Sequence, residues 1–353
     1  MSIKIAIANR KGSYSDQWIN YCKENNVPYK CVDPYATDIV EQVGDCDAFI
    51  WHHHHGNYKD VLFAKQLLFS LEQAGKVVFP DFRTGWHFDD KVGQKYLFEA
   101  LEIQAAPSWV FYNEESAYRW IETATFPKVF KLRGGAGSSN VMLAHNAREA
   151  RHLVKRAFGR GFAQFRGWDY IKDRYKLYKS HAIGLWDFTR SFAHLFIPSK
   201  FSKYIGPEKG YAYFQEFIPN EGFDYRMEIS DDKIIAWVRQ CREGDFRASG
   251  GHMNSASPSL IPPEVIDFAY ECYDKLYVQS VALDIVRDRD TKQFYLIEIS
   301  YCYGPDDDEF DHGYWTRDGV HHKEAFNGIH WMIKEVIRKV INNQKNKDKR
   351  STP

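Results

Sequence analysis

The first 85 residues constrain the fold most, because short apolar runs and longer amphipathic segments alternate there. Short apolar runs are typical of buried strands, and the segments between them have the spacing of helices. The predicted strands are IKIAIA (3–8), YKCVD (29–33), DAFIWHH (47–53) and KVVFPD (76–81). The predicted helices are YSDQWINYCKENN (14–26), ATDIVEQVG (36–44) and DVLFAKQLLFSLEQAG (60–75). This β-α-β-α order predicts a small parallel sheet with right-handed crossovers.

The rest of the chain has longer runs of successive strands. A helix is predicted over 89–102, where Asp89 or Asp90 suits the N-cap position. The other predicted strands are 107–113, 127–133, 141–144, 212–218, 224–230, 233–243, 280–288 and 294–300, and the other predicted helices are 147–158, 262–277 and about 324–341. We expect the strands from 212 to 243 to be antiparallel, residues 160–212 to form an aromatic, helix-prone insert, and the polar tail 343–353 to fray.

The balance of charges in the composition gives no support for some classes of partner. Lys plus Arg and Asp plus Glu both number 47 in 353 residues, so the net charge is zero. This balance gives no support for duplex nucleic acid or an acidic membrane as the main partner, although it leaves a local basic groove open. No segment approaches the roughly 20 apolar residues that span a bilayer. The six cysteines are scattered, as expected for reduced thiols in a cytoplasmic protein.

Residues 127–143, PKVFKLRGGAGSSNVML, contain a lysine followed by a loop of glycines and serines. A Walker loop ends in Gly-Lys-Ser/Thr and leads into a helix, so this segment is not one. A dinucleotide fingerprint requires glycine where Asn140 stands, and it too leads into a helix, whereas NVML is strand-like. The segment is therefore either a hairpin whose glycine amides can approach phosphate closely, or an ordinary hairpin turn.

Four segments occur in one order at suitable spacing. They are FDDKVGQKYLFEALEIQAAPSW (88–109), FPKVFKLRGGAGSSNV (126–141), YFQEFIPNEGFDYRMEISDDKIIAWVRQCREGDFRASGG (213–251) and ALDIVRDRDTKQFYLIEIS (282–300). The series resembles the ATP-grasp superfamily, in particular its branch of ribosomal-protein glutamate ligases and glutathione synthetases. The resemblance covers roughly residues 88–302 and implies an α/β (α+β) chain with the ATP-grasp fold.

The resemblance also implies a division into domains. Residues 1–88 would form a small parallel-sheet domain before the ATP-grasp part. Residues 89–213 would form the central and lid subdomain with the 160–212 insert, residues 214–342 the C-terminal subdomain, and 343–353 a polar tail.

The resemblance implies a set of residues for ATP. Lys131 matches the family lysine that lies against the α and β phosphates, and Lys91 matches a second one, with Lys95 as the substitute. Lysines are more often simply solvated, so a surface role stays open for each of them. By the same match, the loop amides would come from Gly134, Gly135, Gly137 and Ser138, the backbone around the adenine from Glu216, Phe217 and Ile218, and the ribose contact from Glu221. The alternation of an ordinary strand would also produce the segment around 215–217.

Arginines and acids in the next strands are expected to carry the chemistry. Asp224 and Arg226 are two apart, so they lie on one face of a strand. In the family, arginines at positions matching Arg226 and Arg247 bind the substrate carboxylate and the transferred phosphoryl group, and Arg239 is a third candidate. A planar guanidinium suits both anions through paired hydrogen bonds. The alternative is a pair of salt bridges on the surface of a sheet.

Asp284 and Glu298 each interrupt an apolar strand. A buried carboxylate is unfavourable unless it is paired or bound to metal. Carboxylates together with ATP phosphates can hold Mg²⁺. The resemblance implies a third ligand two residues after the glutamate, normally asparagine, and this chain has Ser300 there. Since a serine hydroxyl is shorter and a poorer ligand, one of two magnesium ions would bind weakly or through water.

Three features fall outside the resemblance. His52–His55 end a predicted strand, where an ordinary polar loop, a substrate contact and a metal site are the alternatives. Residues 166–209 carry nine Lys/Arg and four Asp/Glu among aromatic residues, which suits either an anionic substrate or the packing face of an insert. Asp306–Asp308 could attract an amine or form a solvated loop.

The resemblance implies an ATP- and Mg²⁺-dependent ligase that joins a carboxylate to an amine through an acyl phosphate. The aromatic insert and the EIS variant at 298–300 resemble members that amidate a sugar acid in bacterial surface-polysaccharide synthesis. A ligase for peptides or protein tails and an ATP-binding regulator without turnover are the alternatives. The expected partners are small-molecule carboxylate and amine substrates, with no nucleic acid and no membrane, and a homodimer is left open.

Overall fold

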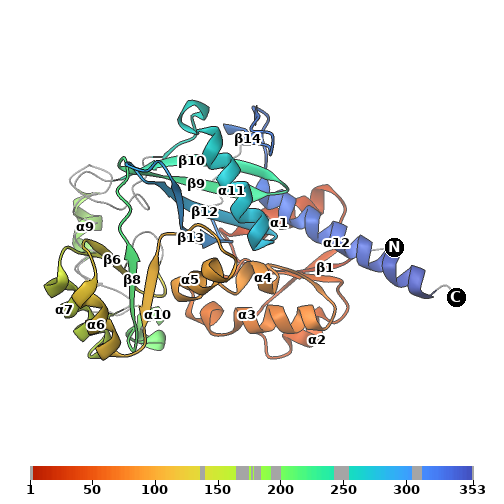
Figure 1. Cartoon of the computed structure of the whole chain (residues 1–353). Coiled ribbons are helices and arrows are strands. Elements are labelled where there is room, and N and C mark those ends of the chain that lie inside the picture. The colour runs from red at the N-terminus through yellow and green to blue at the C-terminus, as the bar shows by residue number, and fades with distance from the viewer. Residues whose placement is uncertain are drawn as a thin grey trace. The chain divides into compact units, whose positions relative to one another are not determined.

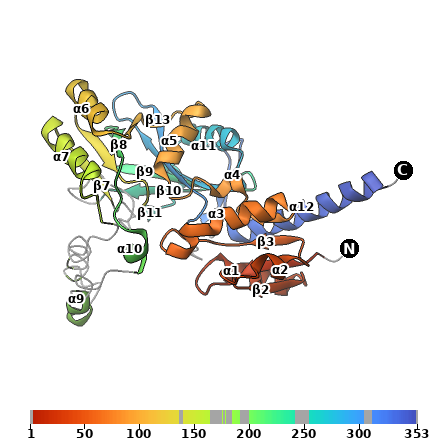
Figure 2. The same ribbon diagram turned by 90° about the horizontal axis from the view of Figure 1, so that it is seen from below.

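The computed structural model describes residues 3–135, 140–163, 175, 178, 184–191, 200–241, 254–303 and 312–351. These residues form two compact units (Figures 1 and 2). Unit 1 contains Met1–His54, Lys59–Ala106 and Ile218–Pro353, and unit 2 contains His55–Tyr58 and Pro107–Phe217. The domain limits given above remain a prediction. No helix in the described ranges is long and apolar enough to cross a membrane.

The N-terminal part of unit 1 is the predicted parallel sheet. Its strands are β1 (Ile5–Ala8), β2 (Tyr29–Val32), β3 (Ala48–Ile50) and β4 (Val77–Phe79), in the order β2-β1-β3-β4. The helices are α1 (Tyr14–Glu24), α2 (Ile39–Val43), α3 (Tyr58–Gln73), α4 (Phe82–Gly85) and α5 (Lys91–Ala100). Every strand pair in this sheet is parallel, which confirms the prediction from β-α alternation.

The C-terminal part of unit 1 is a mainly antiparallel sheet of seven strands. Its long strands are β9 (Phe223–Ser230), β10 (Lys233–Gln240), β12 (Ser280–Arg287) and β13 (Phe294–Ser300), in the order β13-β12-β9-β10, and the short strands are β11 (Asn254–Ser255), β14 (Tyr314–Trp315) and β15 (His321–His322). A short 3-10 turn (Pro258–Leu260) precedes α11 (Pro263–Leu276), and α12 (Gly328–Ser351) follows the sheet. One sheet face packs on α11 through Met227, Ile266 and Leu283.

Helix α12 differs from its prediction at both ends. It begins at Gly328 and reaches Ser351, whereas the sequence predicts a helix over about 324–341 and a frayed tail. Lys, Arg and Gln are good helix formers, so a helix already started by its apolar part extends through the polar part. The apolar part packs beside α1, where Trp18 Nε1 donates to the carbonyl of Ile329 at 3.1 Å.

Unit 2 is built on a four-stranded antiparallel sheet. The strands are β5 (Ser108–Phe111), β6 (Lys128–Lys131), β7 (Val141–Ala144) and β8 (Ala212–Glu216), in the order β5-β8-β6-β7, and the helices are α6 (Glu114–Thr123), α7 (Ala147–Phe158), α9 (Leu185–Ser191) and α10 (Lys200–Ile205). Phe130 and Phe214 pack on α6 and α7 from one face of the sheet. Helix α6 was not predicted, although Asn113 caps it by accepting the Ser116 N–H at 2.8 Å.

Candidate functional site

One face of the sheet in unit 1 carries most of the predicted catalytic and metal-binding residues. Neighbouring strand residues point to opposite faces, so Met227 enters the core while Arg226 lies on the other side. The cross-strand pairs are Arg226 with Asp284, Asp224 with Arg239, and Asp284 with Glu298. We call this surface the charged face, and its residues are Asp224, Arg226, Glu228, Arg239, Asp284 and Glu298, together with Lys91 from α5.

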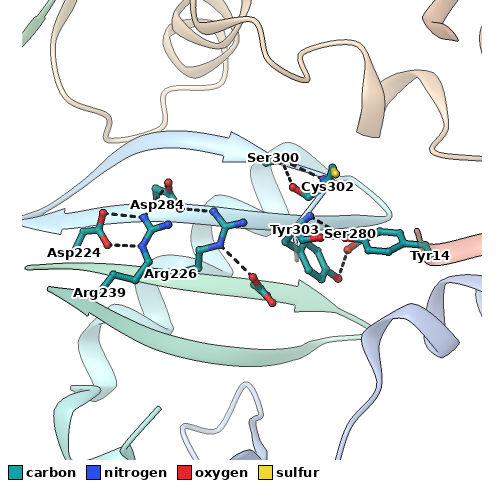
Figure 3. Close-up of polar contacts among 10 residues, drawn as sticks. Tyr14, Asp224, Arg226, Arg239, Ser280, Asp284, Ser300, Cys302 and Tyr303 are labelled. Atoms are coloured by element: carbon teal, nitrogen blue, oxygen red, sulfur yellow. Dashed lines mark hydrogen bonds and ion pairs between the residues drawn. The ribbon is translucent and has the colours of Figure 1, made fainter. Parts of the chain in front are cut away.

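Arg239 binds two carboxylates. Its Nε and Nη2 donate to the two oxygens of Asp224 at 2.7 and 2.8 Å, and Nη2 also lies 3.0 Å from Asp284 Oδ2. Such a fork-to-fork pair fixes the plane of the guanidinium as well as its position. Figure 3 shows Arg239 held between Asp224 and Asp284.

Arg226 binds the other side of Asp284. Its Nη1 donates to Asp284 Oδ1 at 2.8 Å, and its Nε donates to Glu228 Oε1 at 3.1 Å (Figure 3 shows the first of these). Burial raises the pKa of Asp284, but Arg239 and Arg226 outweigh burial and hold the pKa below its ordinary value. Asp284 is therefore an ionised carboxylate between two guanidinium groups.

Lys91 and Glu298 form a second ion pair on this face. Lys91 Nζ lies 2.9 Å from Glu298 Oε1, and the lysine side chain is 4% exposed. Lys91 is the first residue of α5, where a cation is unfavourable for the helix dipole, so tertiary contacts and not helix propensity hold it there. Burial lowers its pKa, but Glu298, Asp89 and Asp284 raise it more, and the net shift is upward.

A bulge in β13 places Glu298 on the charged face. Asp284 pairs with Glu298 while Ile285 pairs with Leu296, so Ile297 is the extra residue. Because of this shift, Leu296 and Ile299 both enter the core. Bulges redirect single side chains in this way and are frequent near active sites.

Glu228 is a residue of the charged face that we did not predict from the sequence. Its side chain is 5% exposed, and burial raises its pKa despite Arg226 and Arg239 nearby. The signal was present, because Asp224, Arg226 and Glu228 alternate with apolar residues along one strand. A third charged residue at that spacing extends the charged face by one strand position.

Ser300 makes local contacts with the backbone. Its hydroxyl donates to the Cys302 carbonyl at 2.7 Å and accepts the Cys302 N–H at 3.1 Å, as Figure 3 shows. The hydroxyl therefore closes a turn at the end of β13. A role for Ser300 as third metal ligand stays a prediction, and it would require this turn to share the hydroxyl oxygen with the ion.

Strand β3 ends at Ile50, so the predicted extension of this strand to His53 is wrong; of the histidine run that follows, His52 and His53 are buried, and His54 and His55 are partly exposed. His52 Nδ1 accepts the Tyr14 N–H at 3.1 Å, and His52 Nε2 lies 2.8 Å from Cys302 Sγ. Tyr301 donates its hydroxyl to the His53 carbonyl at 2.5 Å. These contacts tie His52 and His53 to the chain beyond β13, because buried polar groups must be satisfied internally.

In unit 2, Lys131 lies on the sheet face opposite α6 and α7. It pairs across the strands with Tyr213 and Val141, and it is 6% exposed. Lys128 lies on the helix side, where its Nζ is 2.8 and 2.7 Å from the two oxygens of Glu216. The Glu216 N–H donates to the Pro107 carbonyl at 2.7 Å, so this amide belongs to the sheet.

The other predicted nucleotide residues are only partly covered by the structure. Gly134 and Gly135 begin the glycine loop, and Gly135 has a φ of +124°, which favours glycine. Glu221 forms an exposed ion pair with Lys292 at 3.0 Å, and Ile218 is buried. Gly137, Ser138 and Arg247 lie outside the described residues, as do Asp306–Asp308 and about half of the insert.

The charged face carries four carboxylates against three cations, Lys91, Arg226 and Arg239. Within the described ranges, no group of three or more His, Cys, Asp or Glu side chains has the geometry of a complete metal site. Mg²⁺ bound to nucleotide phosphates commonly takes only one or two protein carboxylates. Asp284 and Glu298 are directly opposite on neighbouring strands, so they fit such a partial site.

No family model matches this sequence, and no curated protein was found to be related to it. Solved structures do resemble it. The D-alanine–D-alanine ligase from Bacillus anthracis complexed with ATP is 13% identical, with 98% of this chain and 99% of that chain covered and a TM-score of 0.58. The biotin carboxylase from Campylobacter jejuni complexed with β-γ-ATP is 12% identical, with 94% and 70% covered and a TM-score of 0.58.

A third similar structure is the N5-carboxyaminoimidazole ribonucleotide synthetase from Thermotoga maritima. It is 14% identical, with 85% of this chain and 68% of that chain covered and a TM-score of 0.53. These proteins have the ATP-grasp fold, and this chain, like that fold class, combines a parallel sheet with antiparallel sheets in an α/β structure. The chain therefore has the ATP-grasp fold, as the four sequence segments predict.

Proposed function

We propose that the protein is an ATP- and Mg²⁺-dependent ligase that joins a carboxylate to an amine. The observation that carries the proposal is the charged face, where Lys91 and Arg239 are buried and Arg226 is 18% exposed among carboxylates in a chain with the ATP-grasp fold. The ATP complexes of similarly folded ligase and carboxylase structures support ATP as the nucleotide.

The reaction would proceed in two steps. A carboxylate oxygen attacks the γ-phosphorus of ATP, the bond to the β-phosphate oxygen breaks, and ADP leaves. The amine nitrogen then attacks the carbonyl carbon of the acyl phosphate, and phosphate leaves. No covalent intermediate with the protein is required.

The main barrier is electrostatic, since an anion must approach a triphosphate. Fixed cations lower that barrier most when their positions are set before the reaction. Hydrogen bonds to Asp284 and Glu228 fix the position of Arg226. Hydrogen bonds to Asp224 fix the position of Arg239. We assign these two arginines the carboxylate and the transferred phosphoryl group, and we assign Arg247 the same role from the resemblance.

The residues that we propose for binding the nucleotide and the metal are those that the sequence resemblance implies. Asp284 and Glu298 would hold Mg²⁺, with Ser300 as a weaker third ligand, and the bound ion would supply positive charge to the phosphates. The residues proposed to contact ATP are Lys91, Lys131, Gly134, Gly135, Gly137, Ser138, Glu216, Phe217, Ile218 and Glu221. For the substrate, we propose a sugar acid in surface-polysaccharide synthesis, with a peptide or protein tail as the alternative.

A second candidate is an ATP-binding regulator without turnover. It is favoured by two contacts, because both oxygens of Asp284 accept from arginines and the Ser300 hydroxyl is held by Cys302. Each contact would have to share its oxygen with a magnesium ion. ADP release separates the two functions, since a regulator would bind ATP and release no ADP.

The test is ADP release in the presence of ATP, Mg²⁺ and a panel of carboxylates and amines that includes uronic acids and short peptides. We expect Glu298→Gln to abolish Mg²⁺-dependent turnover while the protein stays folded, because glutamine keeps one oxygen for Lys91 but loses the charge. Lys131→Ala should weaken ATP binding in calorimetry. Glu99→Gln, in an exposed pair with Lys95 on α5, is the matched control. Unchanged turnover in Glu298→Gln would overturn the metal assignment.

A further inference from the structure

Two buried polar atoms on the charged face have no hydrogen-bond partner within the described part of the chain. They are Glu228 Oε2, an acceptor, and Trp237 Nε1, a donor. The two side chains are 5% and 9% exposed. Leaving such groups unpaired is unfavourable by about 1–3 kcal/mol each, and buried orphans are rare in native proteins.

The two residues are neighbours on the same sheet face. Trp237 pairs directly with Arg226 across β9 and β10, and Glu228 is the next residue on that face of β9. Diagonal neighbours of this kind are about 7–8 Å apart. The residue opposite Glu228 on β12 is Ala282, whose small side chain carries no group that could pair with the carboxylate.

Glu228 also shares its cation with another carboxylate, because Arg226 binds Asp284 as well. Asp224 forms a paired hydrogen bond with Arg239, Asp284 accepts from both arginines, and Glu298 has Lys91. Within the described residues, Glu228 has one hydrogen bond, from Arg226 Nε to Oε1 at 3.1 Å, and its Oε2 accepts none.

We propose that Glu228 Oε2 binds the amine substrate and takes its proton, and that Trp237 Nε1 donates to an oxygen of the same substrate. This inference rests on the proposed ligase function and specifies the class of its amine. The substrate would be a primary ammonium compound with an oxygen acceptor close to the nitrogen, such as an amino acid or an amino alcohol. An ammonium group would supply an N–H donor to Oε2 and a second positive charge beside that of Arg226.

Glu228 and the leaving phosphate together accept both protons that the ammonium group loses. The ammonium gives one proton to Glu228 Oε2, and the free nitrogen lone pair attacks the carbonyl carbon of the acyl phosphate. The carbon–oxygen bond to the phosphate breaks, and the leaving phosphate takes the second proton from nitrogen. Glu228 then returns its proton to solvent. Burial raises the pKa of Glu228, which suits a carboxylate that must accept a proton near neutral pH.

The experiment compares two kinds of amine in the Glu228→Gln variant, with the carboxylate that supports ADP release in the wild type. Glycine and ethanolamine are ammonium ions at neutral pH, whereas hydroxylamine is uncharged and needs no base. We expect kcat/KM to fall about 100-fold for the ammonium compounds and to change less than about threefold for hydroxylamine. The pH dependence of kcat/KM for glycine should also lose its acidic limb.

Trp237→Phe tests the donor while keeping the ring. We expect its KM to rise for glycine and ethanolamine and to stay unchanged for methylamine, which has no oxygen. Equal losses for charged and uncharged amines in Glu228→Gln would indicate a structural role and would overturn the inference, as would unchanged kinetics. If the wild type releases no ADP with any pair, the proposed function fails and the inference fails with it. Glu99→Gln again serves as control.

Discussion

On the two faces of the same sheet in unit 1, the residues around Met227 and those around Arg226 are stabilised in different ways. On the α11 side, Met227, Leu283 and Ile299 are fully buried and pack against other apolar side chains. On the charged face, the side chains of Arg226 and Arg239 are 18% and 10% exposed, and each is held by carboxylates. Adjacent residues of one strand therefore contribute to stability by packing on one side and by charge pairing on the other.

The difference shows which face is built for a ligand. An apolar core needs no ligand once its side chains fill the available volume. Buried ion pairs are often no more stabilising than apolar residues of similar size, so stability alone does not explain them. Among the described residues, the charged face also leaves Glu228 Oε2 without a hydrogen-bond donor, which a face selected only for stability would not need.

We expect the largest effect on stability from removing Arg226 on the charged face. Arg226→Ala leaves Asp284 and Glu228 without a shared cation, so we expect the free energy of unfolding to fall by about 3–5 kcal/mol. Chemical denaturation at neutral pH measures this. A loss below about 1 kcal/mol would mean that water screens this face as it screens surface pairs.

The matched change on the other face is Met227→Ala at the next position of β9. It removes buried atoms and leaves a cavity, so we expect a loss of about 3 kcal/mol. The two changes should differ in salt dependence. Added salt should alter the effect of Arg226→Ala and leave that of Met227→Ala nearly constant, since packing is not screened. Equal salt dependence would contradict the division into two kinds of face.

The smallest expected effect concerns pH and two carboxylates of the charged face. The pKa of Asp284 is lowered by its arginines against the effect of burial, so its contribution to stability is present above its unfolded pKa and is lost as pH falls. The pKa of Glu228 is raised by burial, so the folded state holds its proton more tightly and stability falls as pH rises through that range.

The corresponding variants should therefore change in opposite directions with pH. As pH falls from about 4 to about 2, Asp284→Asn should become less destabilising relative to wild type, and as pH rises from about 4 to about 7, Glu228→Gln should become less destabilising, each by about 1 kcal/mol. Urea denaturation across these ranges tests the signs. The same trend in both variants would show that Glu228 is held in the ionised form by its surroundings.

Much of the architecture could be predicted because it depends on local patterns. Helix α7 has the predicted bounds, and strand β12 lies within its predicted segment. The parallel order of the N-terminal sheet follows from β-α alternation, and Asp224 and Arg226 share a face because a strand alternates. These features require only the spacing of residues that are near in sequence.

Only the tertiary structure decided which partners the charged residues have. Sequence spacing does not reveal that Lys91 pairs with Glu298, that a bulge turns Glu298 toward Asp284, or that the Ser300 hydroxyl closes a turn. It also does not show that one oxygen of Glu228 has no donor in the part of the chain that the structure describes. The strength of each such contact depends on burial and on groups distant in sequence, because charge interactions act through space and weaken where water enters.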